Sequence, residues 1–186
     1  EGLEKSVTLA SIVAGKTLKT LEKAFKTSNL VRIMPNLALR ADEGASAFTA
    51  SPGANPANVE AIEKILSAAG RAVRLEEEHF DAVTALSGSG PAFFAFMEQA
   101  MAEGGVKLGL PPAAARLLAE QTMLGTAAFL RQSQMDLDEF IRSVATKGGT
   151  TAAGMDVLFA SPFKGIVAGT LEAAARRSAE LGRSSR

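Results

Sequence analysis

The chain contains no cysteine, which excludes disulfide bonds, thiolate metal sites and cysteine nucleophiles. It also has no excess charge of either sign, because 20 Lys and Arg residues balance 20 Asp and Glu residues. A balanced chain gives no electrostatic footprint for nucleic acid or for an anionic membrane, so neither is predicted as a partner. No apolar run reaches the roughly 18 residues that a transmembrane helix needs, and no membrane span is predicted.

A dinucleotide-binding loop of the pattern G-x-G-x-x-G is also missing. The nearest approach to it is Gly88 and Gly90, but Phe93 stands where the third glycine is needed. His79 is the single histidine, and we expect it to mark a boundary or a helix start rather than to be an acid–base group. No metal site is predicted. The 47% hydrophobic and 22% charged residues are typical of a globular protein with one large domain or two small ones.

The first 75 residues alternate between β-prone and helical patterns. Short apolar runs bounded by Gly, Pro or Asn predict strands, and apolar residues at helical spacing predict helices. A helix is expected after the capping residue Thr17, and another is expected to end at Gly70. The predicted strands are residues 7–13, 30–34, 45–50 and 71–75. This alternation favours an α/β sheet.

Beyond the charged residues 76–79 the chain is rich in alanine and reads as about five helices. Ser87 to Pro91 interrupt the helical pattern, and a helix is expected to begin again at the proline. Further helices are predicted from Pro111, over 136–145, and after Pro162. Because small side chains leave each helix little apolar area to bury, we expect this half to form a homodimer.

The corner at Gly148 and Gly149 is the strongest candidate for chemistry. A predicted helix ends there, and Thr150 and Thr151 open the next one. The first N–H groups of a helix lack intrahelical partners and carry partial positive charge, so such a corner suits a carboxylate or a phosphate. The alternative is an ordinary helix–turn–helix corner with a threonine N-cap. The local sequence leaves both interpretations open.

Several segments in this order resemble the pyrroline-5-carboxylate reductase family, whose members catalyse the last step of proline synthesis. The resemblance covers nearly the whole chain, and five motifs occur in register. They are Ile33-Met34-Pro35-Asn36, the run from His79 to Leu86, Ser87-Gly88-Ser89-Gly90-Pro91-Ala92-Phe93, the run from Gly104 to Pro111, and Gly148-Gly149-Thr150-Thr151.

The resemblance implies an α/β region followed by an all-α region, that is, a partial Rossmann-type sheet with a helical dimerisation domain. Residues 1–76 then correspond to the later part of an NAD(P)-binding Rossmann domain, and residues 77–186 to a helical domain for dimerisation and substrate binding. Since the chain starts at Glu1 and lacks the glycine-rich loop, we expect a fragment. The implied cofactor is NADPH or NADH, and the implied enzyme is cytoplasmic and a homodimer or a higher homo-oligomer.

The resemblance also assigns roles to the matching positions. The cofactor-binding residues would be Ala14, Met34, Pro35 and Asn36. The residues that bind the imino-acid substrate would be Ser87, Gly88, Pro91, Thr146, Gly148, Gly149 and Thr150. Thr151 would place its hydroxyl beside the ring nitrogen, and Ser89 is the second predicted catalytic residue. The cofactor carries the hydride chemistry, and the protein orients the partners, which explains a pocket without a catalytic histidine.

Some positions depart from the family pattern. Leu37-Ala38 replaces Thr-Pro, Thr146-Lys147 replaces Ser-Pro, and Gln134 falls where an acidic residue is common. Two alternatives therefore stay open. One is a related hydroxyacid dehydrogenase, for which Lys107 is the nearest acid–base lysine. The other is a non-catalytic helical dimerisation module that binds a small carboxylate.

Overall fold

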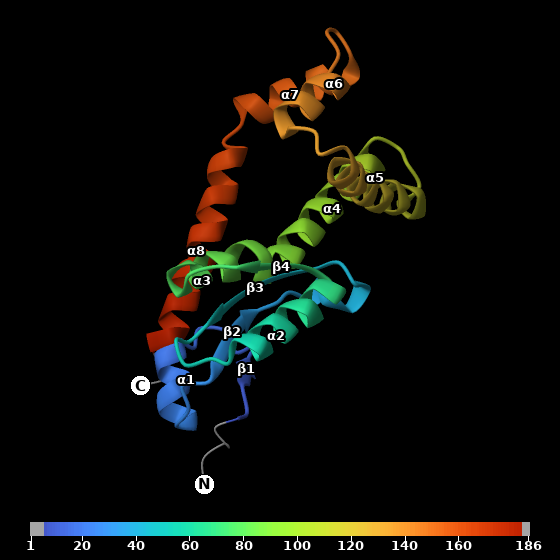
Figure 1. The fold of residues 1–186 in the computed structure, drawn as a ribbon. Coiled ribbons are helices and arrows are strands. Elements are labelled where there is room, and N and C mark those ends of the chain that lie inside the picture. Colours follow the sequence, from blue (N-terminus) through green and yellow to red (C-terminus); the bar gives the residue numbers. More distant parts are fainter. Residues whose placement is uncertain (1–5, 184–186) are drawn as a thin grey trace. The chain divides into compact units, whose positions relative to one another are not determined.

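The computed structural model describes residues 6–183 (Figure 1). Its internal contacts divide the chain into two units. Unit 1 contains the chain up to Pro91 together with the chain from Gly169 onward, and unit 2 is Ala92–Ala168. The boundary between a nucleotide-binding and a substrate-binding domain, predicted between residues 76 and 77, concerns function and stays a prediction.

Unit 1 is built on a four-stranded sheet with the order β1-β2-β3-β4. Strands β1 and β2 are parallel, β2 and β3 are antiparallel, and β3 and β4 are parallel. All four predicted strands are present, although β1 is shorter than the predicted 7–13. The strands are β1 (Leu9–Ser11), β2 (Leu30–Met34), β3 (Gly44–Ala50) and β4 (Gly70–Arg74).

Two helices connect these strands, and each begins at a residue suited to capping. Helix α1 (Leu18–Phe25) starts after Thr17, whose hydroxyl accepts a hydrogen bond from the backbone N–H of Thr20, as predicted. Helix α2 (Pro56–Ala68) starts after Asn55, and its first residue is a proline, which needs no hydrogen-bond acceptor at that position. Both helices therefore begin where the local sequence favours it.

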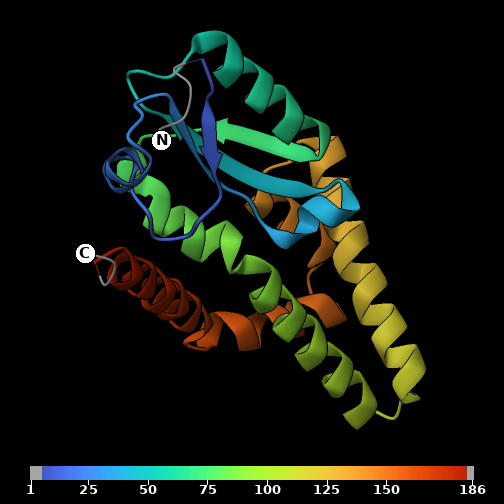
Figure 2. The same ribbon diagram turned by 90° about the horizontal axis from the view of Figure 1, so that it is seen from below.

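The hydrophobic core of unit 1 lies between α2 and one face of the sheet. Val31, Ile33 and Phe48 from the strands pack with Val59 and Leu66 from α2. Side chains alternate between the two faces of a strand, so the residues between Val31 and Ile33 and after them point to the opposite face. Figure 2 shows α2 on one face of the sheet and the segment that follows β4 on the other.

That second segment is helical throughout. It consists of η2 (Glu77–His79), α3 (Phe80–Val83) and the π-helical turn η3 (Thr84–Gly88), and it leads into α4 (Gly90–Lys107). A helix begins beside Pro91, as predicted, and the residues before it form a π-helical turn and the single non-helical residue Ser89 in place of a loop. The N–H of Ser89 donates to the carbonyl of Thr84 at 2.8 Å, five residues back, so a widened turn absorbs the Ser and Gly residues.

Unit 2 consists of helices, and residues 90–183 contain five helices, α4 to α8, in agreement with the sequence. The bounds of the remaining four are α5 (Pro112–Ser133), α6 (Leu137–Val144), α7 (Thr150–Ala160) and α8 (Phe163–Arg183). The part of α8 from Gly169 onward belongs to unit 1. Across the described part of the chain no single helix is long and apolar enough to cross a membrane, whereas α7 and α8, bent by 57°, pass jointly on length and composition alone.

Candidate functional site

The end of β2 carries Met34, Pro35 and Asn36. Proline has no N–H for the sheet, so β2 ends at Met34. The side-chain oxygen of Asn36 accepts a hydrogen bond from the N–H of Ala45 at 3.2 Å, which fixes this side chain against β3. The Asn36 amide nitrogen donates to none of the described residues. Leu37, one of the two departures from the family pattern here, opens the 3-10 turn η1 (Leu37–Ala41).

Met34 extends to the face of the sheet opposite α2 and meets Gly88 there. A Cβ atom at Gly88 would overlap the terminal methyl carbon of Met34. Glycine is therefore needed at this position for Met34 to lie against the π-helical turn. This contact joins one predicted cofactor-binding residue to one predicted substrate-binding residue within unit 1.

The hydroxyl groups of the π-helical turn differ in their hydrogen bonding. The Thr84 hydroxyl donates to the Phe80 carbonyl at 2.7 Å, and the Ser87 hydroxyl donates to the Val83 carbonyl at 3.3 Å. The half-buried Ser89 hydroxyl has no hydrogen-bond partner among residues 6–183. Of the two predicted serines, Ser89 is thus the one whose hydroxyl is available to a ligand.

Ala14 lies in the turn after β1, next to Gly15, which has a φ of +75°. A Cβ atom at Gly15 would lie 3.0 Å from the backbone nitrogen of Gly182 in α8, so the turn and the helix pack closely. Because β1 and β2 are parallel, their carboxyl ends lie at the same edge of the sheet. In open α/β sheets ligands bind at this edge, where Ala14 follows β1 and Met34 is the last residue of β2.

The glycine-pair corner lies in unit 2, between α6 and α7. Gly148 has a φ of +75°, a conformation that favours glycine, and the N–H of Gly149 donates to the Thr146 carbonyl at 2.9 Å. A Cβ atom at Gly149 would lie 2.8 Å from the Thr146 hydroxyl oxygen, so the Thr146 side chain lies over Gly149. The corner is a tight turn closed by its own backbone.

The N-cap of α7 is Gly149, and Thr150 and Thr151 are its first two residues. The alternative of a threonine N-cap is therefore wrong, because both threonines already have helical positions. The N–H groups of Thr150, Thr151 and Ala152 have no acceptor among the described residues. Both threonine side chains are exposed. Three backbone donors and two hydroxyl groups are thus available at one helix start.

The predicted site residues fall into two sets. The first set lies in unit 1 and comprises Ala14, Met34, Pro35, Asn36, Ser87, Gly88, Ser89 and Pro91. The second lies in unit 2 and comprises Thr146, Gly148, Gly149, Thr150 and Thr151. His79 directly precedes α3 and is exposed, and Lys107 is the exposed last residue of α4. Within residues 6–183 no group of three His, Asp or Glu side chains could hold a metal ion.

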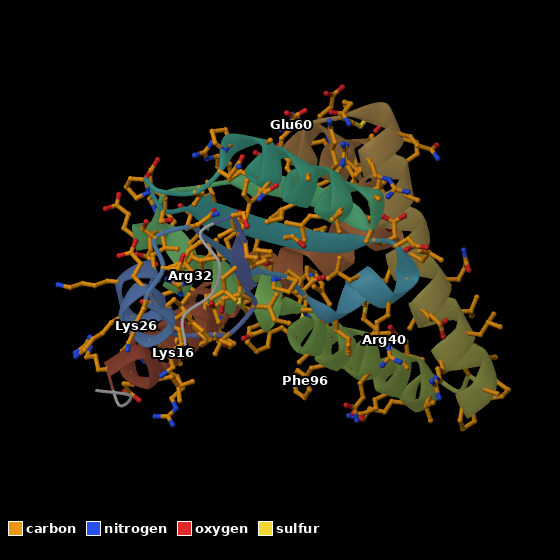
Figure 3. The ribbon with its side chains drawn as sticks, turned by 60° about the horizontal axis from the view of Figure 1, so that its bottom comes forward. Lys16, Lys26, Arg32, Arg40, Glu60 and Phe96 are labelled. Atoms are coloured by element: carbon orange, nitrogen blue, oxygen red, sulfur yellow. The ribbon has the colours of Figure 1, made fainter. Side chains whose placement is uncertain are left out.

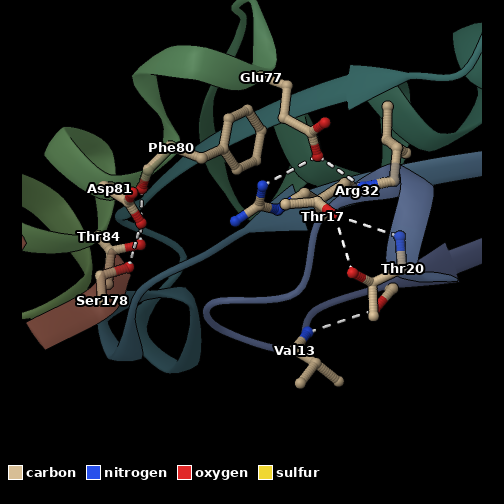
Figure 4. A network of polar contacts seen from close by, with 11 residues as sticks. Val13, Thr17, Thr20, Arg32, Glu77, Phe80, Asp81, Thr84 and Ser178 are labelled. Atoms are coloured by element: carbon tan, nitrogen blue, oxygen red, sulfur yellow. Dashed lines mark hydrogen bonds and ion pairs between the residues drawn. The ribbon is translucent and has the colours of Figure 1, made fainter. Parts of the chain in front are cut away.

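A polar network in unit 1 was not predicted from the sequence (Figure 4). Arg32 of β2 is 5% exposed, and its guanidinium lies 3.0 Å from a carboxylate oxygen of Glu77. The same oxygen accepts the backbone N–H of Leu18 at 2.6 Å. The guanidinium also lies 4.5 Å from the centre of the Phe80 ring, within the range of a cation–π interaction. The available signal was a charged residue inside a strand that otherwise reads as buried.

A mixed four-stranded sheet precedes a helical region in this chain. Gly88 lies against the end of β2, and Gly149 is the N-cap of α7. Residues 77–181, more than half of the chain, match the family model described as pyrroline-5-carboxylate reductase dimerisation. The chain therefore belongs to the pyrroline-5-carboxylate reductase family.

Individual relatives agree with this assignment. The pyrroline-5-carboxylate reductase of Synechocystis is 40% identical over 173 residues, which cover 93% of this chain and 65% of the relative. The Arabidopsis thaliana enzyme is 36% identical over 182 residues, covering 98% and 66%. The chain thus spans slightly less than two thirds of the length of these relatives.

Solved structures show the same fold. A pyrroline-5-carboxylate reductase from Coxiella burnetii superposes with a TM-score of 0.90 at 30% identity, covering 94% of this chain and 66% of that one. The Plasmodium falciparum pyrroline carboxylate reductase, determined with NADP bound, gives a TM-score of 0.86 at 28% identity, covering 95% and 72%. The prediction of a partial α/β sheet followed by helices is confirmed.

Proposed function

We propose that the protein to which this chain belongs reduces the C=N bond of 1-pyrroline-5-carboxylate to give proline, with NADPH or NADH as the reductant. The observation that carries this proposal is the contact between Met34 and Gly88. It brings a residue at the carboxyl edge of the parallel strands together with a turn whose Ser89 hydroxyl is available to a ligand. Membership of the reductase family supports the same reaction.

The residues present fit the nicotinamide end of such a cofactor. Gly88 leaves room for the Met34 methyl group, and Asn36 presents an amide nitrogen that donates to no described residue. Ala14 and Met34–Asn36 would hold this end of the cofactor at the sheet edge. The cofactor, when bound, supplies a hydride.

Substrate binding is assigned to the start of α7. A carboxylate would accept hydrogen bonds from the free N–H groups of Thr150, Thr151 and Ala152, and the helix dipole adds to their attraction. Gly149 cannot contribute its N–H, because Thr146 already accepts it. The exposed side chain of Lys147 adds a positive charge beside the same corner. We therefore assign Gly149 the role of shaping the corner, whereas the N–H of Gly148, which has no acceptor among the described residues, can join the donors to the carboxylate.

The hydroxyl groups complete the proposed chemistry. Thr151 would hold a proton or a water molecule beside the ring nitrogen, because a protonated imine accepts a hydride more readily. Ser87 and Pro91 would line the pocket, and the free hydroxyl of Ser89 would orient the imine. Holding the imine and the cofactor in a reactive orientation lowers the barrier to hydride transfer. We expect this orientation to be the main contribution of the protein to the rate.

The same proposal covers assembly, domain roles and compartment. We propose that residues 1–76 complete a nucleotide-binding domain and that residues 77–186 supply substrate binding and homodimerisation. The helices of unit 2 expose large apolar side chains, among them Phe96, Leu117 and Phe159. A homodimer or higher homo-oligomer would cover such side chains, and a cytoplasmic location is proposed from the family alone.

The test uses the full-length protein with 1-pyrroline-5-carboxylate, and follows the loss of absorbance of the reduced cofactor. The wild type should turn over, and Thr151→Ala should slow turnover by roughly tenfold or more, as expected for the loss of a group that assists proton transfer. Thr151→Ser, which keeps the hydroxyl, is the matched control and should retain most of the rate. Equal rates for Thr151→Ala and Thr151→Ser would remove this hydroxyl from the mechanism.

A wild type without turnover would refute the reductase assignment. Oxidation of a hydroxyacid with sensitivity to Lys107→Ala would then favour the dehydrogenase alternative. Binding of a small carboxylate without oxidation or reduction would favour a non-catalytic module.

A further inference from the structure

We propose that Glu77 is a positioning residue for the reductase. Through Arg32 and the backbone of Leu18, its carboxylate sets the place of the β2 end relative to the π-helical turn, and so the contact between Met34 and Gly88. The proposal rests on the proposed function for its kinetic consequence. Its structural consequence stands independently.

Arg32 is a buried charge in a central strand. It points to the face of the sheet opposite α2, as Met34 does two residues later, since alternate residues of a strand share a face. Figure 3 shows Arg32 inside unit 1, whereas the side chain of Lys26 extends into solvent. A buried guanidinium needs a partner, and the Glu77 carboxylate is that partner.

One carboxylate oxygen of Glu77 accepts two hydrogen bonds that come from different segments. One comes from the Arg32 guanidinium at 3.0 Å, and the other from the N–H of Leu18 at 2.6 Å. Leu18 opens α1, close after the turn that carries Ala14 and Gly15. A single side chain in the segment after β4 thus contacts both β2 and the segment that follows β1.

A continuous helical segment leads from Glu77 to Gly88. Phe80, which is 1% exposed, lies under the Arg32 guanidinium, and its carbonyl accepts the hydroxyl of Thr84 at 2.7 Å. Thr84 opens the π-helical turn, which ends at Gly88. The segment from Glu77 to Gly88 is hydrogen-bonded helix throughout, so a displacement at Glu77 would be passed to the turn that Met34 contacts.

A second link in unit 1 provides a contrast. The Ser178 hydroxyl donates to Asp81 at 2.6 Å and attaches α8 to α3 (Figure 4). This bond touches neither β2 nor Leu18. Its loss in Asp81→Ala or Ser178→Ala should affect the attachment of α8 while leaving Met34 and Gly88 in contact.

The test compares Glu77→Ala, Glu77→Gln and Glu60→Ala in the full-length protein. Glutamine keeps an oxygen that can accept both hydrogen bonds, whereas alanine keeps none. Glu60→Ala is the matched control, because Glu60 forms an ion pair with Lys64 at 2.7 Å in which both side chains are exposed. Since removing Glu77 alone leaves a buried guanidinium unpaired, the double variant Arg32→Met, Glu77→Leu is made in parallel.

The first measurement is NMR of methionine methyl groups labelled with carbon-13, with the Met34 signal assigned through Met34→Leu. In the wild type and in Glu60→Ala, the Met34 methyl should show nuclear Overhauser effects to the α-protons of Gly88. Glu77→Ala and the double variant should lose them, and Glu77→Gln should keep them. Retention of these effects in a folded Glu77→Ala or double variant would overturn the proposal, whatever the enzymatic activity.

The second measurement is turnover at saturating substrate and cofactor, well below the unfolding temperature. Glu77→Ala or the double variant should lower kcat by about tenfold to a hundredfold with KM changed by less than about threefold, because misplaced reacting groups slow the reaction itself. Glu77→Gln should remain within about threefold of the wild type. A lower Tm with unchanged kcat would show a purely structural role and overturn the positioning proposal. A wild type that binds cofactor but has no turnover would instead refute the proposed function.

Discussion

Replacing Gly88 by alanine tests the contact on which the proposed site depends. The added methyl group would overlap the terminal carbon of Met34, and the next nearest side-chain atom outside Met34 is the Thr84 methyl, at 3.8 Å. Met34 therefore has to move. Thr84 can stay in place, because its methyl group would lie at an ordinary van der Waals distance from the added carbon. Because the Met34 side chain is flexible, we expect it to take a new rotamer while the backbone stays in place.

The two stability effects of Gly88→Ala oppose each other. Forcing Met34 out of its rotamer costs about 0.5–1.5 kcal/mol. Alanine in a helical position is more stable than glycine by about 0.5–1 kcal/mol. The net change in the free energy of unfolding should therefore stay within about 1 kcal/mol, and the main effect should fall on the site. A tenfold loss of kcat/KM corresponds to about 1.4 kcal/mol of lost transition-state stabilisation, and we expect a loss of at least this size.

The assay combines urea unfolding with steady-state reduction of 1-pyrroline-5-carboxylate in the full-length protein. Gly90→Ala is the matched control, because a Cβ atom at Gly90 would meet no described atom within 4 Å. Gly90→Ala should keep the wild-type kcat/KM, and both variants should unfold near the wild-type urea concentration. Equal kcat/KM values for Gly88→Ala and Gly90→Ala would refute the role given to the Met34 contact.

Three further predictions concern stability. Phe48→Ala removes a side chain with no exposed surface and should lower the free energy of unfolding by about 3–5 kcal/mol in urea titrations; a loss below about 1 kcal/mol would contradict the core as described. Thr17→Ala removes the cap of α1 and should cost about 1 kcal/mol in the same titrations, whereas Thr17→Ser should cost much less. Asp136→Ala removes an acceptor of two N–H groups at 2.9 and 3.2 Å and should cost about 1 kcal/mol, with a wild-type midpoint as the contrary result.

The elements that could be predicted from sequence are those that local chemistry begins and ends. Strand β2 ends at Met34 because Pro35 follows, and α1 begins after Thr17 because its hydroxyl caps the helix. β1 was predicted over residues 7–13 but spans only Leu9–Ser11, since its register with β2 pairs three residues. The extent of a strand depends on its partner, which a single segment does not reveal.

The π-helical turn could not be predicted because it depends on packing. Serine and glycine in succession are typical of loops, and the sequence of residues 87–90 contains only these two types. In the structure, Met34 lies against Gly88, and Thr84 and Ser87 direct their hydroxyl groups to carbonyl groups of the preceding turn. The same small residues that favour a loop in isolation allow a helix to pass close to a strand end.

The glycine-pair corner shows which part of a helix start can be predicted from sequence and which part depends on how the turn closes. The sequence predicted a helix start with free N–H groups after Gly149, and α7 begins there. The family resemblance implies that Gly149 binds the substrate, and the Gly149 N–H already donates to the Thr146 carbonyl within the turn. The donors left in α7 are those of Thr150, Thr151 and Ala152, and the N–H of Gly148 in the turn before them also has no acceptor among the described residues. A carboxylate bound to them would lie on the helix axis, beside the Thr151 hydroxyl that the proposed protonation requires.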